Sequence, residues 1–202
     1  PPPPRKPLRH PVGRRARAPR ELSHPQRYPG KARVMADEFF YTTPLHPLAQ
    51  PLVEQLTWEY TTRYGSQFGE PPGAEMSRYP AELFAPPDGN FVLLLRDGRP
   101  IAGGAFKRYD ERTAEMKRIW THSDFRRQGL ARRIVAEVEA QAVRQGYGKI
   151  YLTTGFRQPE AKGLYLETGY TPLFDVSADP AFYRKLPFEK ELVAIPASAT
   201  RP

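Results

Sequence analysis

The chain has 202 residues, enough for one domain with a sizeable core and too few for two. It has no cysteine, which excludes disulfides, thiolate metal sites and cysteine nucleophiles, and no run approaches the roughly 18 apolar residues that a membrane helix needs. The formal net charge is +9, but residues 1–34 hold ten basic residues and one acid, while the other 168 residues hold 21 of each. These features predict a cytoplasmic protein whose folded part does not bind nucleic acid.

Residues 1–34 also contain nine prolines and almost no large apolar residue. Such a segment buries too little surface to offset its ordering entropy, so we expect a disordered basic extension, either simply solvated or a tether for an anionic surface or RNA. Composition changes abruptly at Met35, which we expect to be the natural start. The folded domain is predicted over residues 35–195, followed by a short tail at 196–202.

The first half of the domain predicts a helix between short strands. Pro47 to Tyr64 carries an apolar stripe at helical spacing, and residues 65–90, with five prolines and four glycines, predict a long loop with a helical turn near Ala81 to Phe84. Asp97-Gly98 is typical of a hairpin turn. The predicted strands of this half are Phe39–Thr42, Phe91–Leu95, Pro100–Tyr109 and Ala114–Thr121. In the last of these we expect Met116, Arg118 and Trp120 to alternate with Glu115, Lys117, Ile119 and Thr121.

The second half alternates between helices and strands. Apolar spacing predicts helices from Gly129 to Arg144, where Gly146 follows as a C-cap, and from Pro159 to Thr168. The predicted strands are Lys149–Thr153, Tyr170–Val176 and Phe188–Val193. The order of elements predicts an α/β (α+β) domain with a mixed, mostly antiparallel central sheet and helices on both faces.

One segment predicts an anion site. In Arg126-Arg127-Gln128-Gly129-Leu130-Ala131, the glycine and the alanine let a ligand approach the backbone closely. The helix that follows presents free N-terminal amides and the positive end of its dipole, and two arginines add charge. By itself, a basic turn before a helix is also a common structural feature.

The flanking segments carry a resemblance to the GCN5-related N-acetyltransferase (GNAT) superfamily. Arg126, Gly129 and Ala131 match its motif Arg/Gln-x-x-Gly-x-Gly/Ala. The segment 114–121 resembles its fourth strand, and Pro159-Glu160-Ala161, Leu164-Tyr165 and Gly169-Tyr170 resemble its later helix and turn. The matches occur in the family's order over about residues 91–175.

The resemblance implies that acetyl-CoA is the cosubstrate, that no metal is needed, and that the coenzyme lies where the fourth and fifth strands splay apart. The fourth strand would pair with the pantetheine arm, and the pyrophosphate would lie on the loop at the helix start. Thr154 stands where many relatives carry an asparagine that bonds this arm. The implied coenzyme contacts are Ile119, Trp120, Thr121, Arg126, Arg127, Gln128, Gly129, Leu130, Ala131, Arg132 and Thr154.

Two residues are candidates for proton transfer. A lysine-like amine has a pKa near about 10 and must lose a proton before it attacks. Glu115, the one acid of the fourth strand, would accept that proton, or else is an exposed carboxylate paired with Lys117 or Arg118. Tyr165 lies where the family often has a tyrosine near the coenzyme sulfur, so it would protonate the departing thiolate, or else pack as a core aromatic.

The resulting prediction is an N-acetyltransferase that acts on a primary amine of a small molecule or peptide by direct attack through a tetrahedral intermediate. The resemblance is also compatible with a homodimer. A non-catalytic acyl-CoA sensor of the same fold is an alternative. A nucleotide-binding protein is disfavoured because neither phosphate-loop motif is present. Trp58, Tyr60 and Tyr64 would border the acceptor site, although such aromatics more often serve packing.

Overall fold

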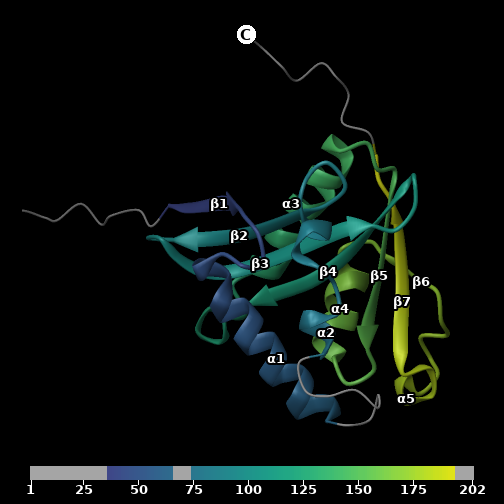
Figure 1. Ribbon diagram of the computed structural model, residues 1–202. Helices are drawn as coiled ribbons and strands as arrows, with labels where there is room; N and C mark the ends of the chain where they lie inside the picture. Colours follow the sequence, from purple (N-terminus) through teal and green to yellow (C-terminus); the bar gives the residue numbers. More distant parts are fainter. Residues whose placement is uncertain (1–35, 66–73, 194–202) are drawn as a thin grey trace, which may run out of the picture. The chain divides into compact units, whose positions relative to one another are not determined.

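The computed structural model describes residues 36–65 and 74–193 (Figure 1). The predicted extension at 1–34 and the tail at 196–202 lie outside the described residues, as does part of the predicted loop, 66–73.

The described chain forms one seven-stranded sheet in the order β1-β2-β3-β4-β5-β7-β6. Its strands are β1 (Asp37–Tyr41), β2 (Asn90–Arg96), β3 (Arg99–Arg108), β4 (Thr113–Thr121), β5 (Lys149–Gly155), β6 (Thr171–Pro172) and β7 (Lys185–Glu191). Every neighbouring pair is antiparallel except β4 and β5, which run parallel. The predicted mixed, mostly antiparallel sheet is confirmed.

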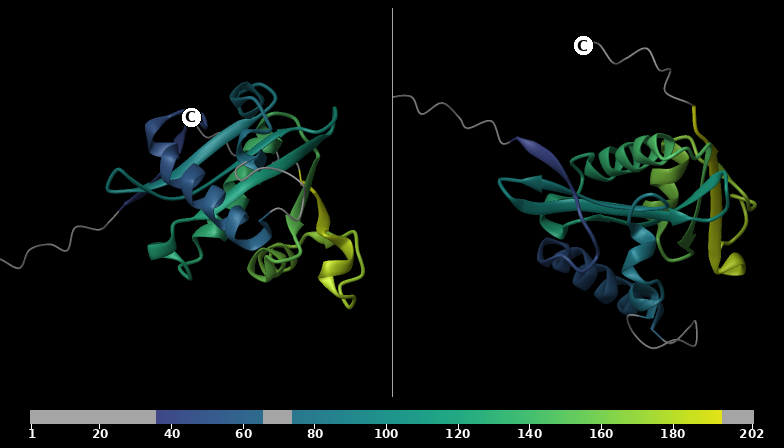
Figure 2. Two further views of the ribbon diagram at one scale, coloured as in Figure 1. Left: turned by 60° about the horizontal axis from the view of Figure 1, so that its bottom comes forward. Right: turned by 45° about the horizontal axis from the view of Figure 1, so that its top comes forward.

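Helices cover both faces of this sheet, as the right view of Figure 2 shows, where α3 (Leu130–Arg144) and α1 (Gln50–Tyr64) lie on opposite sides. Strand β2 is buried almost throughout because its side chains alternate between two cores. Val92 and Leu94 pack with Ile134 and Val138 of α3, in what we term the α3 core. Phe91, Leu93 and Leu95 pack with Leu52 and Leu56 in the α1 core.

The helices begin and end close to the predicted residues. Pro47–Ala49 is a 3-10 turn (η1) that leads into α1. The second residue of α1 is Pro51, which lacks an amide N–H and is tolerated there because the first amides of a helix have no partner within the helix. Helix α3 ends before Gly146, which has a φ of 92°. The remaining helical elements are α2 (Ala74–Ser77), η2 (Ala81–Phe84), η3 (Ser123–Phe125), α4 (Pro159–Glu167) and α5 (Pro180–Tyr183).

The sequence prediction was wrong at the C-terminal strands. Only Thr171–Pro172 of the predicted strand Tyr170–Val176 pairs as β6, against Phe188 and Glu189. Strand β7 begins earlier than predicted, at Lys185, and ends at Glu191. Ladder pairing with β5 over its full length sets these bounds, and hydrophobic pattern alone does not encode such pairing.

A bulge in β4 breaks the predicted alternation of side chains. Gly103 of β3 pairs with Trp120 and Ala105 pairs with Lys117, so Gly104 faces two residues of β4. One of them, Arg118, has a φ of 60°, in the left-handed region that non-glycine residues rarely adopt. Met116 and Ile119 therefore pack in the α3 core, while Trp120 belongs to the α1 core and the Arg118 guanidinium lies over Phe84 of that core.

Gly104 lies where the sheet meets α3, and its packing can be tested. A Cβ there would come within 2.6 Å of Ile134 and 2.7 Å of Ile119. We expect Gly104→Ala to lower the free energy of unfolding by about 1–3 kcal/mol, because both neighbours are packed in the core. Gly163→Ala in α4, where a Cβ meets nothing within 4 Å, is the matched control and should stabilise slightly through helix propensity. Urea denaturation of both variants measures the difference, and equal effects would contradict this account.

Candidate functional site

The central strands of the sheet separate. β4 and β5 pair only over Thr113, Ala114 and Glu115, opposite Lys149, Ile150 and Tyr151. Beyond these residues β4 keeps β3 as its partner and β5 keeps β7, and the two arrows diverge in Figure 1. Within the described chain, the inner edge of β4 after Glu115 therefore has no strand partner, as the resemblance implied.

The gap opens into a cavity of about 990 Å³. Its walls come from α1, α2, β3, β4, β5 and α4 and from the residues around α5. Such a volume suits an organic ligand, and the unpaired edge of β4 offers backbone groups to it. The described lining residues include seven tyrosines, six basic side chains and two acids.

The predicted anion loop lies at the N-terminus of α3. Gly129 precedes the helix with a φ of 74°, and no side chain caps the first amides. Arg127 also has a positive φ, 62°, and both residues are exposed. Uncapped amides at the positive end of a 15-residue helix are able to bind an anion.

The basic side chains of this loop differ in their partners. Arg126 pairs with Glu59 at 3.2 Å, and Arg132 pairs with Glu167. Gln128 accepts a hydrogen bond of 3.1 Å from Arg96. Across the described residues, the Arg127 guanidinium has no ion-pair partner, so it is the arginine most available to a ligand at this helix end.

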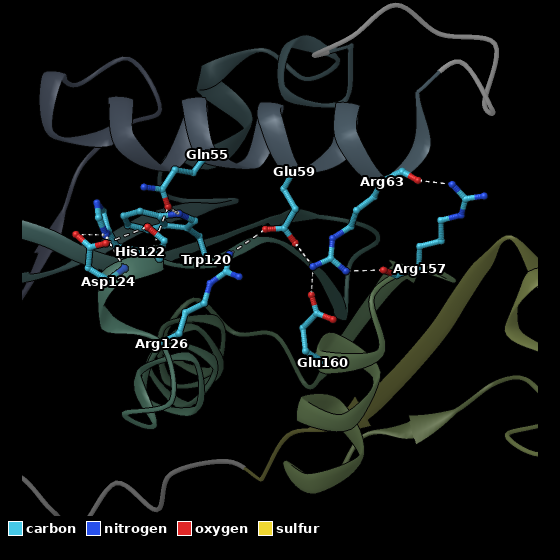
Figure 3. Close-up of polar contacts among 10 residues, drawn as sticks. Gln55, Glu59, Arg63, Trp120, His122, Asp124, Arg126, Arg157 and Glu160 are labelled. Atoms are coloured by element: carbon cyan, nitrogen blue, oxygen red, sulfur yellow. Dashed lines mark hydrogen bonds and ion pairs between the residues drawn. The ribbon is translucent and has the colours of Figure 1, made fainter.

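A chain of polar contacts links α1 to both sides of the gap (Figure 3). Glu59 of α1 pairs with Arg126 before α3 and with Arg63 at 3.0 Å. Arg63 in turn pairs with Glu160 of α4 and donates to the carbonyl oxygen of Arg157. Because these contacts span from the start of α3 to α4, they help to fix the width of the opening.

Glu115 lies at the point where β4 and β5 part. Its carboxylate lies 2.8 Å from the Nζ atoms of both Lys107 and Lys117, and only 7% of the residue is exposed. Burial raises the pKa of Glu115, but hydrogen bonds and charge from the two lysines outweigh it and hold the pKa below its ordinary value of 4.5. The predicted pairing with Lys117 is observed, while exposure of Glu115 and pairing with Arg118 are not.

Tyr165 of α4 lines the same cavity and is 7% exposed. Its ring packs edge to face on Tyr170, with centroids 5.5 Å apart, and lies 5.7 Å from Phe188. Burial raises the pKa of its hydroxyl well above the usual value of 10, so the phenol stays protonated at neutral pH. Both predicted uses of this residue, packing and donation of a proton, are compatible with this position.

Thr154 of β5 lines the cavity through a buried side chain. Its hydroxyl donates a hydrogen bond to Oε1 of Gln158 at 3.1 Å, and the same oxygen accepts a hydrogen bond from the backbone N–H of Gly155. Gln158 therefore fixes the turn between β5 and α4. No sequence motif indicated this role of Gln158, because the contact forms only where the chain turns from β5 into α4.

Several predicted ligand contacts point away from the cavity. Ile119 lines it, but the Trp120 indole is buried in the α1 core and donates to Gln55 at 3.1 Å. The Leu130 side chain belongs to the α3 core, so only its backbone can reach a ligand. The hydroxyl of Thr121 is buried and has no hydrogen-bond partner in the described ranges.

Other residues that line the cavity were not among the predicted coenzyme contacts. Arg118 is 8% exposed and borders the cavity from the bulge in β4. Of the three aromatics predicted to border the acceptor site, Tyr60 and Tyr64 of α1 line the cavity, whereas Trp58 is 69% exposed and lies outside it. Bulges are enriched beside active sites, but the β4 sequence carries no glycine that would have signalled one.

Among the helices of residues 36–65 and 74–193, none has the length and hydropathy of a membrane-spanning segment. The same residues contain no group of three or more histidine, aspartate or glutamate side chains positioned to hold a metal ion.

Comparison with known proteins gives a family match. The model of the acetyltransferase (GNAT) family matches residues 53–170, which include β4, the loop before α3 and Tyr165. No protein with a curated description matches the chain.

Solved structures share the fold at low identity. The PaiA N-acetyltransferase from Thermoplasma acidophilum, in complex with coenzyme A, is 17% identical with a TM-score of 0.59, covering 78% of this chain and 99% of its own. An acetyltransferase from Thermus thermophilus is 18% identical with a TM-score of 0.58 over 79% and 99%. A GNAT family acetyltransferase from Elizabethkingia anophelis with acetyl-CoA bound is 16% identical with a TM-score of 0.51 over 77% and 98%.

The charge cluster at Glu115 yields a prediction about stability. Glu115→Gln should lower the free energy of unfolding at pH 7 by about 3 kcal/mol, because it leaves two largely buried ammonium groups uncompensated. The lowered pKa of Glu115 means that its contribution is present above pH 4.5 and is lost as pH falls through the folded-state value. Wild type and variant should therefore converge in stability as pH falls from 4.5 through that lower folded-state value.

The matched control is Glu191→Gln, which breaks more exposed pairs with Arg112 and Lys149 and should cost less than about 1 kcal/mol. Denaturant titrations across acidic and neutral pH measure both variants. Equal losses, or a Glu115→Gln loss that does not change with pH, would contradict the assignment.

Proposed function

Because this chain belongs to the acetyltransferase (GNAT) family, we propose that it transfers the acetyl group of acetyl-CoA directly to the nitrogen of a primary amine. The observation that carries the proposal is the gap between β4 and β5, which opens a cavity in the sheet. The uncapped N-terminus of α3 follows β4 and suits a diphosphate. Two proteins of the same fold were solved with coenzyme A or acetyl-CoA bound, which supports the choice of donor.

The donor has a complementary surface along β4 and α3. The pyrophosphate would accept hydrogen bonds from the amides of Gly129 to Ala131 and a charge-assisted contact from Arg127. The amide-bearing arm would pair with the free edge of β4 near Ile119 to Thr121, as an added strand does. Thr154 on β5 would face the arm from the opposite side of the gap.

Proton transfer would use two residues of the same cavity. Tyr165 stays protonated, so its hydroxyl can give a proton to the departing thiolate as charge develops there. Glu115 stays ionised and can accept the proton that the amine loses, through water. The two lysines beside Glu115 weaken it as a base, so the amine must bind close to its neutral form.

Donor binding has a direct test. Acetyl-CoA at about 100 times its Kd should raise the unfolding midpoint by about 5–10 °C, whereas ATP and NAD should not. Arg127→Gln should reduce the shift, because Arg127 is the unpaired arginine of the described loop, while Arg144→Gln at the other end of α3 should leave it unchanged. No shift with any acyl-CoA would overturn the proposal. A shift without release of CoA thiol in the presence of any amine would favour the sensor alternative.

Turnover tests the proton donor. Tyr165→Phe should lower kcat by about 100-fold while the acetyl-CoA shift persists, because the ring still packs on Tyr170 and only the hydroxyl is lost. Glu115→Gln, assayed at a temperature where it is folded, should also lose turnover if that carboxylate accepts the amine proton. Release of CoA thiol followed over pH measures both variants. Full activity of either variant would contradict the role assigned to the residue that it replaces.

A further inference from the structure

The buried Arg118 carries a positive charge that the described protein does not neutralise. Its backbone lies at the bulge of β4 with a φ of 60°, and the residue is 8% exposed while it lines the cavity. The guanidinium lies over the Phe84 ring, 4.3 Å from its centroid, and donates one hydrogen bond of 2.8 Å to the carbonyl oxygen of Met76. Among the described residues, its other four N–H donors have no hydrogen-bond partner.

The acids that face this part of the cavity are engaged elsewhere. The Glu115 carboxylate is held between Lys107 and Lys117, at 2.8 Å from each. Glu75 interacts with Arg118 only at longer range and forms its ion pair with Arg78, at 2.7 Å. Within the described ranges, no carboxylate lies in ion-pair range of Arg118. A buried, largely desolvated arginine without a counter-ion is costly, and a ligand that supplies one would offset that cost.

The donor does not supply this anion. The diphosphate of acetyl-CoA would lie at the N-terminus of α3, and residues 126–131 do not line the cavity that Arg118 borders. The arm that would enter the gap carries amides and no charge. Neither the donor nor the described residues supply this anion, which leaves the acceptor as its source.

The charge of the whole cavity agrees with this reasoning. Its described lining has six basic side chains, Arg118 and Lys185 among them, and only two acidic ones. A polyamine or another multiply cationic acceptor would be repelled by this surface. An acceptor with an anionic group would be attracted to it.

We infer that Arg118 binds a carboxylate of the acceptor, so that the substrates are amines that also carry a carboxylate, such as amino acids. The planar guanidinium suits a carboxylate because it can donate two parallel hydrogen bonds. The bulge turns Arg118 toward this side of the sheet, while the unpaired edge of β4 remains next to the donor. The inference rests on the proposed function and names the acceptor class of the same site.

The first test uses the wild-type protein and matched ligands. The common amino acids are each compared with their own carboxamide, because the two differ mainly in the anion, and spermidine is added as a polycation. In CoA-thiol release, the best amino acid should exceed its carboxamide by about 10- to 100-fold in kcat/KM. Carboxamides or spermidine that react as well as the acids would overturn the inference.

Binding gives a readout that does not need turnover. In the presence of CoA, the best amino acid should raise the unfolding midpoint while its carboxamide does not. If acetyl-CoA itself gives no shift, the proposed function fails. If acetyl-CoA shifts the midpoint but acids and amides behave alike, only the acceptor inference fails.

Variants at Arg118 complete the test. Arg118→Met keeps much of the side-chain volume against Phe84 and should reduce the preference for acid over amide by at least about 10-fold, with the acetyl-CoA shift retained. Arg118→Lys keeps the charge and should restore part of the preference. Arg108→Met, an exposed arginine of β3 outside the cavity, is the matched control and should change nothing. An unchanged preference in folded Arg118→Met would contradict the inference.

Discussion

The candidate site exists because β4 and β5 do not hydrogen-bond to each other over most of their length. In a continuous sheet, the inner edges of both strands would pair along their length. Here pairing stops at Glu115 and Tyr151, and each strand is held only by its outer neighbour. The free edge that results is internal to the fold, so it is protected from association with other chains and open to an extended ligand.

Packing on the outside of the gap keeps it open. Two cores, one under α3 and one under α1, anchor β4 from opposite faces. The contacts that run from Arg126 through Glu59 and Arg63 to Glu160 join the two sides across α1 (Figure 3). Closing the gap would require these groups to move together, so the cavity is largely formed before any ligand binds.

Charge is divided between two regions that adjoin the gap. At the start of α3, uncapped amides and the exposed Arg127 suit the anionic end of a donor. Inside the cavity, Glu115 balances two lysines, and Arg118 remains without a counter-ion among the residues described. The bulge makes this division possible because it places Lys117 and Arg118, which are adjacent in sequence, toward the same side of the sheet.

The sequence by itself determined the family and most of the helices and strands before β6. Local signals sufficed for β2, α1, α3 and α4, because apolar periodicity and terminal prolines and glycines act within a few residues. Only the tertiary structure decided over how many residues β4 and β5 pair and at which residue the β4 side chains stop alternating, which is Arg118. It also decided that Glu115 forms ion pairs with both Lys107 and Lys117. Each of these features depends on contacts between strands or on a backbone conformation that neighbouring residues impose. The pattern of apolar residues along a single strand encodes neither the contacts nor the conformation.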